Sequence, residues 1–170
     1  MKFYLKMALL FVLTLLSNSC EKDDLCTPEQ AVTPRLVIEF KDAINPLEEK
    51  VVERIQVQEI GSTDFAPLDS DGSLVLTNTS TISLPLRTDS ATTSYNLILT
   101  KENITNSDNI NFNYTLNEEY VSRACGFRVI YNNLVAVQTP ESSGDNWIDR
   151  IVVIESNVTN NTDIHVQILH

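Results

Sequence analysis

Three cysteines carry the clearest chemistry in this sequence: Cys20, Cys26 and Cys125. A cysteine sulfur can be modified covalently, can pair in a disulfide, or can bind a metal ion. An exported chain with three thiols keeps one unpaired and reactive unless that thiol is modified. The chemistry of this chain therefore depends on which cysteine is modified and which two pair.

The segment before Cys20 has the features of a secretory leader. Lys2 and Lys6 give it a positively charged start, and residues 7–16 form the apolar run MALLFVLTLL. A helix of this length measures about 15 Å, which is half of a hydrocarbon core of about 30 Å. The run is therefore short for a membrane span and fits the apolar region of a signal peptide, so we expect residues 1–19 to be removed.

Two processing reactions fit the segment Leu16-Ser17-Asn18-Ser19-Cys20. Ser17 and Ser19 are small residues at positions −3 and −1, which ordinary signal peptidase accepts. The same segment resembles a bacterial lipobox, in which a diacylglyceryl group is attached to the cysteine before cleavage. The strict lipobox has Leu at −3, whereas here Leu16 lies at −4.

Lipidation of Cys20 is favoured because it also accounts for the cysteine count. Once Cys20 carries lipid, Cys26 and Cys125 remain, and the oxidising compartment of an exported protein favours a disulfide between them. The alternative is two separate buried thiols. Stable attachment to a membrane needs more than one acyl chain, and a diacylglyceryl group meets that requirement.

The formal net charge of the chain is −11, and removal of the leader also removes Lys2 and Lys6. An acidic domain does not attract nucleic acid or anionic lipid headgroups through its net field. We therefore expect no nucleic-acid partner. Membrane contact is expected through the lipid anchor, and the further partner is expected to be a protein or a glycan.

Signatures of catalysis and metal binding are weak. His165 and His170 are five residues apart, which on a strand places them on opposite faces, and no Cys–His cluster has zinc spacing. The segment Asp69-Ser70-Asp71-Gly72 resembles the start of a calcium loop but lacks the later ligands, so a turn is favoured. The motifs of serine hydrolases, zinc proteases and P-loop enzymes are absent. No catalytic residue, metal ion or cofactor is assigned.

Trp147, together with Tyr131 and Tyr120, is a candidate aromatic platform for a sugar. The alternative is that Trp147 belongs to the core. The core interpretation is favoured because Trp147 and Ile148 open an apolar segment.

From Arg35 onwards, apolar and polar residues alternate with a period of two, which indicates β-strands. The expected strands are residues 36–40, 55–58, 74–76, 81–86, 95–100, 110–116, 127–137, 147–154 and 164–169. Eight or nine strands separated by short polar turns predict a mainly β fold, an antiparallel β-sandwich with a barrel-like arrangement as the alternative.

One segment, 46–54, fits two structures. Asn45 as a cap, Pro46 at the first helical position and acidic residues in the first turn favour a short helix from Pro46 to Arg54. The β-branched pair Val51 and Val52 runs directly into an alternating segment and favours an extended chain from Val51. The extended alternative is preferred.

Several stretches resemble a family of small uncharacterised lipoproteins of Bacteroidetes-type bacteria. They are CEKDDLC at residues 20–26, TPRLVIEF at 33–40, CGFR at 125–128, and Trp147-Ile148. The resemblance covers the whole chain after the leader. It implies a compartment and a fold, and it implies no activity.

Two short motifs gain meaning from that resemblance. Lys22-Asp23-Asp24, directly after the lipidated cysteine, is similar to the export signal that places lipoproteins of this phylum on the outer face of the outer membrane. The alternative is a plain solvated tether, with the domain on the periplasmic face. The sequence Asp89-Ser90-Ala91 matches the acceptor pattern for O-glycans in exported proteins of the phylum, which makes Ser90 a candidate glycosylation site.

The predicted organisation is a signal peptide at 1–19, a lipidated cysteine and tether at 20–33, and a single β-sandwich domain at 34–170. The predicted function is a lipid-anchored, surface-exposed module for binding or assembly. The first alternative is an enzyme that acts on carbohydrate or peptide with paired carboxylates. The second is a subunit of a surface fibre that exchanges strands at a sheet edge.

Overall fold

A computed structural model describes residue 26 and residues 32–140 and 144–170. Its strands are β1 (Leu36–Lys41), β2 (Val52–Glu59), β3 (Leu76–Thr79), β4 (Thr81–Leu84), β5 (Thr92–Lys101), β6 (Ile104–Ser122), β7 (Gly126–Thr139), β8 (Arg150–Val153) and β9 (Val166–Leu169). All regular elements in these ranges are strands, which confirms the predicted mainly β fold. The described residues form a larger unit, 32–119 with 128–170, and a smaller unit, residue 26 with 120–127.

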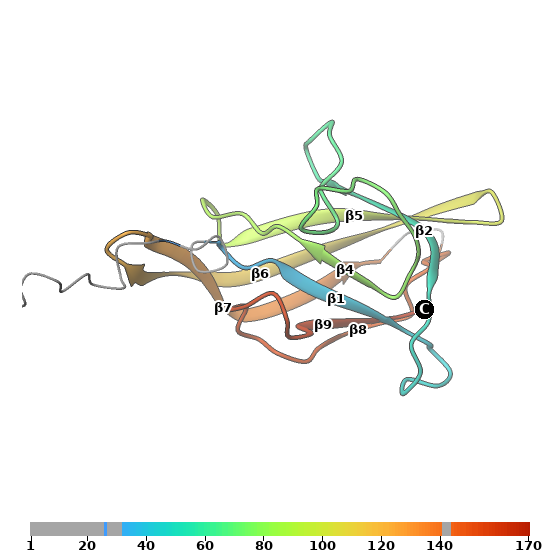
Figure 1. The fold of residues 1–170 in the computed structure, drawn as a ribbon. Helices are drawn as coiled ribbons and strands as arrows, with labels where there is room; N and C mark the ends of the chain where they lie inside the picture. Colours follow the sequence, from blue (N-terminus) through green and yellow to red (C-terminus); the bar gives the residue numbers. More distant parts are fainter. Residues whose placement is uncertain (1–25, 27–31, 141–143) are drawn as a thin grey trace, which may run out of the picture. The chain divides into compact units, whose positions relative to one another are not determined.

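The strands form two sheets (Figure 1), with the orders β4-β1-β9-β8 and β3-β2-β5-β6-β7. Strand β1 pairs antiparallel with β4 but parallel with β9, where Ile38 lies opposite Val166. The pairs β2–β3, β2–β5, β5–β6 and β8–β9 are antiparallel, as the sequence predicted. The parallel pair is a departure that alternation could not predict, because alternation fixes the face of a side chain and not the direction of the neighbouring strand.

The core lies between the two sheets of the larger unit. One side is built from alternate residues of β5 and β6, and the other from β1, β4 and β9. The central buried side chains are Leu36, Ile38, Phe40, Ile82, Leu97, Ile110, Phe112, Val166 and Ile168. Burial of each such side chain contributes roughly 1.5–3 kcal/mol, so this face-to-face packing of a sandwich is the main source of stability.

The segment 46–54 is not helical. The Oδ1 atom of Asp42 accepts the backbone N–H groups of Ile44 and Asn45, and the carbonyl of Asn45 accepts the N–H of Glu48, which closes a turn. Strand β2 then begins at Val52, so the preferred extended alternative is confirmed. The N–H of Asn45, the ammonium of Lys50 and the N–H of Ile44 together lower the pKa of Asp42 to about 2.

The connection 85–91 carries the chain from β4 in one sheet to β5 in the other. Three tyrosine hydroxyls donate hydrogen bonds to three consecutive carbonyls of this connection: Tyr95 to Pro85, Tyr131 to Leu86 and Tyr114 to Arg87. Burial raises the pKa of each phenol, so each stays protonated and available as a donor. The carbonyls of the first three residues of the connection are thereby satisfied.

The replacement Tyr131→Phe should destabilise the domain by about 1–3 kcal/mol, because it removes a buried hydroxyl donor from the Leu86 carbonyl and keeps the ring. Urea denaturation measures the change as a lower midpoint at an unchanged slope. The matched control is Tyr120→Phe, whose ring is 55% exposed and whose loss of a hydroxyl should change stability by less than about 0.5 kcal/mol. Equal effects of the two replacements would contradict the role assigned to Tyr131.

Candidate functional site

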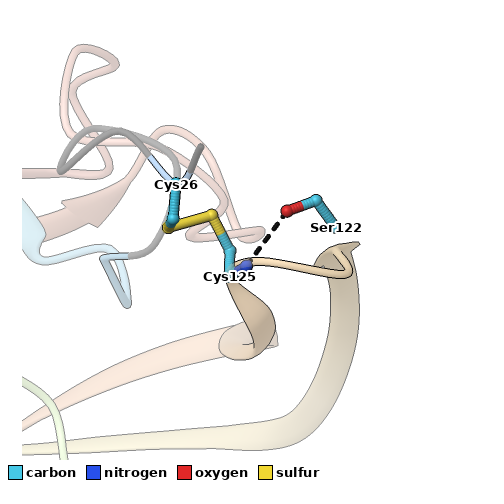
Figure 2. Close-up of a disulfide and its surroundings, with 3 residues drawn as sticks. All are labelled: Cys26, Ser122 and Cys125. Atoms are coloured by element: carbon cyan, nitrogen blue, oxygen red, sulfur yellow. Dashed lines mark hydrogen bonds between the residues drawn. A yellow bond between two sulfur atoms is a disulfide. The ribbon is translucent and has the colours of Figure 1, made fainter. Parts of the chain in front are cut away.

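Cys26 and Cys125 form a disulfide in the smaller unit (Figure 2), with 5.0 Å between their Cα atoms. The backbone N–H of Cys125 donates to the Ser122 hydroxyl at 3.0 Å, which holds the turn that presents the sulfur. This is the pairing that the sequence predicted. The two cysteines are 99 positions apart, and for a loop of about this length the chain-entropy account gives roughly 4–5 kcal/mol of stabilisation.

The residues of the predicted anchor and export signal, Cys20, Lys22, Asp23 and Asp24, lie outside the described residues. Lipidation and sorting therefore stay predictions. Ser90 lies in the 85–91 connection, and its hydroxyl accepts the backbone N–H of Thr92 at 3.2 Å. Its glycosylation also stays a prediction.

The two histidines and the Asp69 segment have separate structural surroundings. His165 is buried, its Nδ1 accepts the N–H of Val37 at 3.0 Å, and its buried Nε2 has no hydrogen-bond partner among the described residues. The Asp69 carboxylate accepts the N–H groups of Asp71 and Ser73, as expected for the favoured turn. A hydrogen bond from the Ser73 side chain foremost, followed by that from the backbone N–H of Ser73, lowers the pKa of Asp69.

The three candidate aromatic residues do not form one platform. Tyr131 is fully buried in the core of the larger unit. Tyr120 belongs to the smaller unit, where its ring centre lies 5.4 Å from that of Phe127. Trp147 is partly buried and packs against the core, as the core interpretation predicted, and its remaining surface lines a cavity.

This cavity is the candidate site in the larger unit. It lies at the end of the sandwich where β5 ends and β2 begins, and its volume is about 680 Å³. Its lining residues are Lys50, Val51, Val52, Glu53, Asn78, Leu99, Lys101, Trp147 and His170. The volume is in the range of small-ligand sites, and the lining combines apolar surface with a few polar groups.

Trp147 is held in the cavity wall by contacts on several sides. Its indole N–H donates to the Leu97 carbonyl at 3.1 Å, and its ring lies 6.3 Å from Phe40 and 5.7 Å from His170 between centres. The flanking residues are fixed by Asp108, a fully buried carboxylate. Asp108 accepts hydrogen bonds from three groups: the amide of Gln138, the amide of Asn146 and the backbone N–H of Ile148.

The cavity has an uneven charge distribution. Lys50 pairs with Asp42 at 3.1 Å and donates to the main-chain oxygen of His170. Lys101 makes no ion pair with any residue of the described ranges. Burial lowers the pKa of His170, so its imidazole is neutral at pH 7. Lys101 is therefore a cation available beside the Trp147 wall.

Glu53 has the one carboxylate side chain among the lining residues, and its Oε2 accepts the N–H of Glu102. Paired carboxylates of the kind that the enzymatic alternative requires are thus not found in this cavity. In the described ranges, no three His, Cys, Asp or Glu side chains form a group that could hold a metal ion. The cavity thus combines an aromatic wall, apolar side chains and one available ammonium group.

Residues 61–170 match the model of DUF6452, a protein family of unknown function. The chain belongs to this family. No curated protein and no solved structure gives a significant match. The matched region contains β3 to β9 and the residues of the cavity that follow Glu53. The match confirms the predicted membership of an uncharacterised family. The lipoprotein nature of the family stays a prediction.

Across the part of the DUF6452 protein that the structure describes, no helix has the length and apolar character needed to cross a membrane.

The stability of the DUF6452 protein should fall as the pH drops below about 6.5, and His165 should contribute to this loss. Burial lowers the pKa of His165, so below about pH 6.5 the unfolded chain binds a proton at this residue that the folded chain excludes. The replacement His165→Gln should flatten the dependence of unfolding free energy on pH between 7.5 and 5.5, measured by urea denaturation. Parallel curves for the two proteins would contradict this prediction.

Proposed function

We propose that this protein is a lipid-anchored protein of the bacterial cell envelope, attached through Cys20, and that its sandwich is a binding module. The observation that carries the proposal is the disulfide between Cys26 and Cys125. It accounts for two of the three cysteines, and Cys20 is the third. Cys20 follows an apolar leader, which is where a lipoprotein carries its acylated cysteine.

The binding role is supported by the cavity at one end of the sandwich. The chain enters the larger unit ahead of Leu36, at the start of β1, and the cavity lies at the end where β1 stops and the 42–51 connection begins. In the proposed arrangement the chain comes from the anchor and runs through β1 towards the cavity. Loops at the end of a rigid sandwich commonly carry functional residues, so this end is a suitable place for a ligand site.

We further propose that the protein is displayed on the outer face of the outer membrane of a Bacteroidetes-type bacterium. The lipid fixes attachment but carries no information about the side of the membrane, so a sorting signal has to be read from nearby residues. Lys22, Asp23 and Asp24 directly follow the anchor and offer one base and two acids. The plain-tether alternative places the same domain on the periplasmic face.

Metabolic labelling with palmitate tests the anchor. The wild-type protein should incorporate label, and Cys20→Ala should incorporate none, because it lacks the sulfur that forms the thioether. The control is Cys26→Ser/Cys125→Ser, which loses the disulfide, keeps Cys20 and should be labelled like the wild type. Equal labelling of Cys20→Ala and the wild type would refute acylation at this residue.

Protease shaving of intact cells tests the display. The wild-type domain should be digested from outside, and the triple replacement Lys22→Ala, Asp23→Ala, Asp24→Ala should be protected while palmitate labelling is unchanged. Permeabilised cells provide the control, since both proteins should then be digested alike. A triple variant that is digested on intact cells as fast as the wild type would show that these residues are not the signal.

A further inference from the structure

The outer face of the five-stranded sheet has an unusual composition. In β5 and β6 the inward side chains are the buried core residues, so by strand alternation the other set faces outward. The outward residues are Thr92, Ser94, Asn96, Ile98 and Thr100 on β5, and Thr105, Ser107, Asn109, Asn111, Asn113 and Thr115 on β6. None of them is charged, and all except Ile98 end in an amide or a hydroxyl. We call this set the amide–hydroxyl face.

The side chains of the amide–hydroxyl face are oriented by one another. The Thr92 hydroxyl donates to Oδ1 of Asn113 at 2.9 Å, and the Ser94 hydroxyl donates to Oδ1 of Asn111 at 2.6 Å. The Nδ2 of Asn111 donates in turn to the Thr139 hydroxyl on β7 at 3.2 Å. These contacts hold the side chains of Asn111 and Asn113 in place before any partner arrives.

A row of three amides crosses the face. The strand register places Gln58 of β2 opposite Asn96 of β5, and Asn96 opposite Asn109 of β6. Neighbouring strands are about 4.8 Å apart, so the three amides repeat at that interval across the sheet. Each amide offers both donor and acceptor groups.

An ordinary solvated face does not account for this composition. Asn is depleted in β-strands, and exposed surfaces normally mix charges of both signs. This chain has 23 acidic residues, yet the outward positions listed for β5 and β6 contain none. Cross-strand hydrogen bonds account for Asn111 and Asn113 but not for Asn96 and Asn109, and departures from local sequence preference without such a gain are expected at functional sites.

The hydrogen-bonding capacity of the face identifies the chemistry of its partner. An ionic partner would find no counter-charge among the outward residues of β5 and β6 that make up the face. The charged Arg54 of β2 lies at the border of the face, opposite Thr100. An apolar protein surface would cover amides and leave them unsatisfied, which costs about 1–3 kcal/mol for each group. A neutral polyhydroxylated ligand supplies a donor and an acceptor at every hydroxyl and matches the amides and hydroxyls of the face.

Apolar side chains interrupt the face and suit the same partner. Ile98 lies among the polar residues of β5, and on β7 the outward residues Val135 and Val137 are 52% and 48% exposed. A pyranose ring carries hydroxyls at its edge and C–H groups on its faces, so it needs both kinds of contact. We propose that the amide–hydroxyl face binds a neutral glycan that lies along β5 and β6. This inference concerns a different surface from the cavity and does not depend on the lipid anchor.

Native affinity electrophoresis of the full chain tests the proposal, with the protein purified in a polyoxyethylene detergent because this detergent contains no sugar. The gels contain dextran, yeast mannan or galactomannan as neutral probes, and polygalacturonate as the anionic probe. The wild-type protein should be retarded by at least one neutral polysaccharide and not by polygalacturonate. Retardation by none of the neutral probes would overturn the proposal.

Substitutions at Asn109 separate a neutral ligand from an acidic one. Asn109→Asp and Asn109→Lys should both weaken binding of the neutral polysaccharide by about tenfold, because either charge is desolvated without a partner. Asn109 makes no side-chain hydrogen bond within the described residues, so both variants should keep the wild-type melting temperature. An acidic ligand would instead bind Asn109→Lys more tightly, and that result would overturn the proposal.

Asn157 provides the matched control, since it is an exposed asparagine outside the two sheets. Asn157→Asp and Asn157→Lys should bind like the wild type, and a loss as large as that at Asn109 would contradict the assigned face. Sedimentation velocity without polysaccharide tests whether the face instead joins two copies of the chain. A wild-type dimer that Asn109→Asp converts to a monomer would show that the face joins two copies of the chain, which also overturns glycan binding.

Discussion

The hydrogen bonds to the buried carboxylate of Asp108 are the interaction on which the cavity end of the sandwich depends. A carboxylate without contact to water is costly unless its oxygens accept hydrogen bonds, and here three donors surround it. One donor lies on β7, and the other two, from Asn146 and Ile148, lie on the segment that leads into β8 of the other sheet. The carboxylate therefore joins the two sheets at this end and fixes Trp147, which stands between two of its donors.

The opposite end of the core uses the same principle with neutral groups. The hydroxyls of Tyr95, Tyr131 and Tyr114 satisfy the backbone of the 85–91 connection, which crosses between the sheets. The 85–91 connection and the segment that leads into β8 are thus both held by buried polar contacts. A buried polar group that lacks its hydrogen bond costs free energy, so these contacts favour one arrangement of the chain. With the interior fixed in this way, the cavity and the outer face of the larger sheet remain free to differ in chemistry without loss of the fold.

Alternation predicted the existence of the strands but not all of their limits or directions. The strand expected at 110–116 runs from Ile104 to Ser122 as β6, and the regular alternation begins only at Ile110 because Asp108 places a carboxylate at an inward position. The strand expected from Trp147 begins at Arg150, since Ile148 gives its N–H to Asp108 and not to a neighbouring strand. Those partners are distant in sequence, and no local pattern shows them. The disulfide was predictable because it followed from the number of cysteines and the expected compartment.

The candidate surfaces were harder to predict for two different reasons. The cavity collects residues from five separate parts of the chain, from Lys50 to His170, and forms no motif. The amide–hydroxyl face was visible in the sequence as the polar half of an alternating pattern, and polarity alone is what any solvent-facing strand shows. Its informative property is the lack of charge over two neighbouring strands, and this needs the pairing of β5 with β6, in which Asn96 lies opposite Asn109 and Ser94 opposite Asn111. The whole chain is acidic, so a surface without charged residues differs from its average composition. Hydrogen bonding to a neutral partner gives a physical reason for this difference.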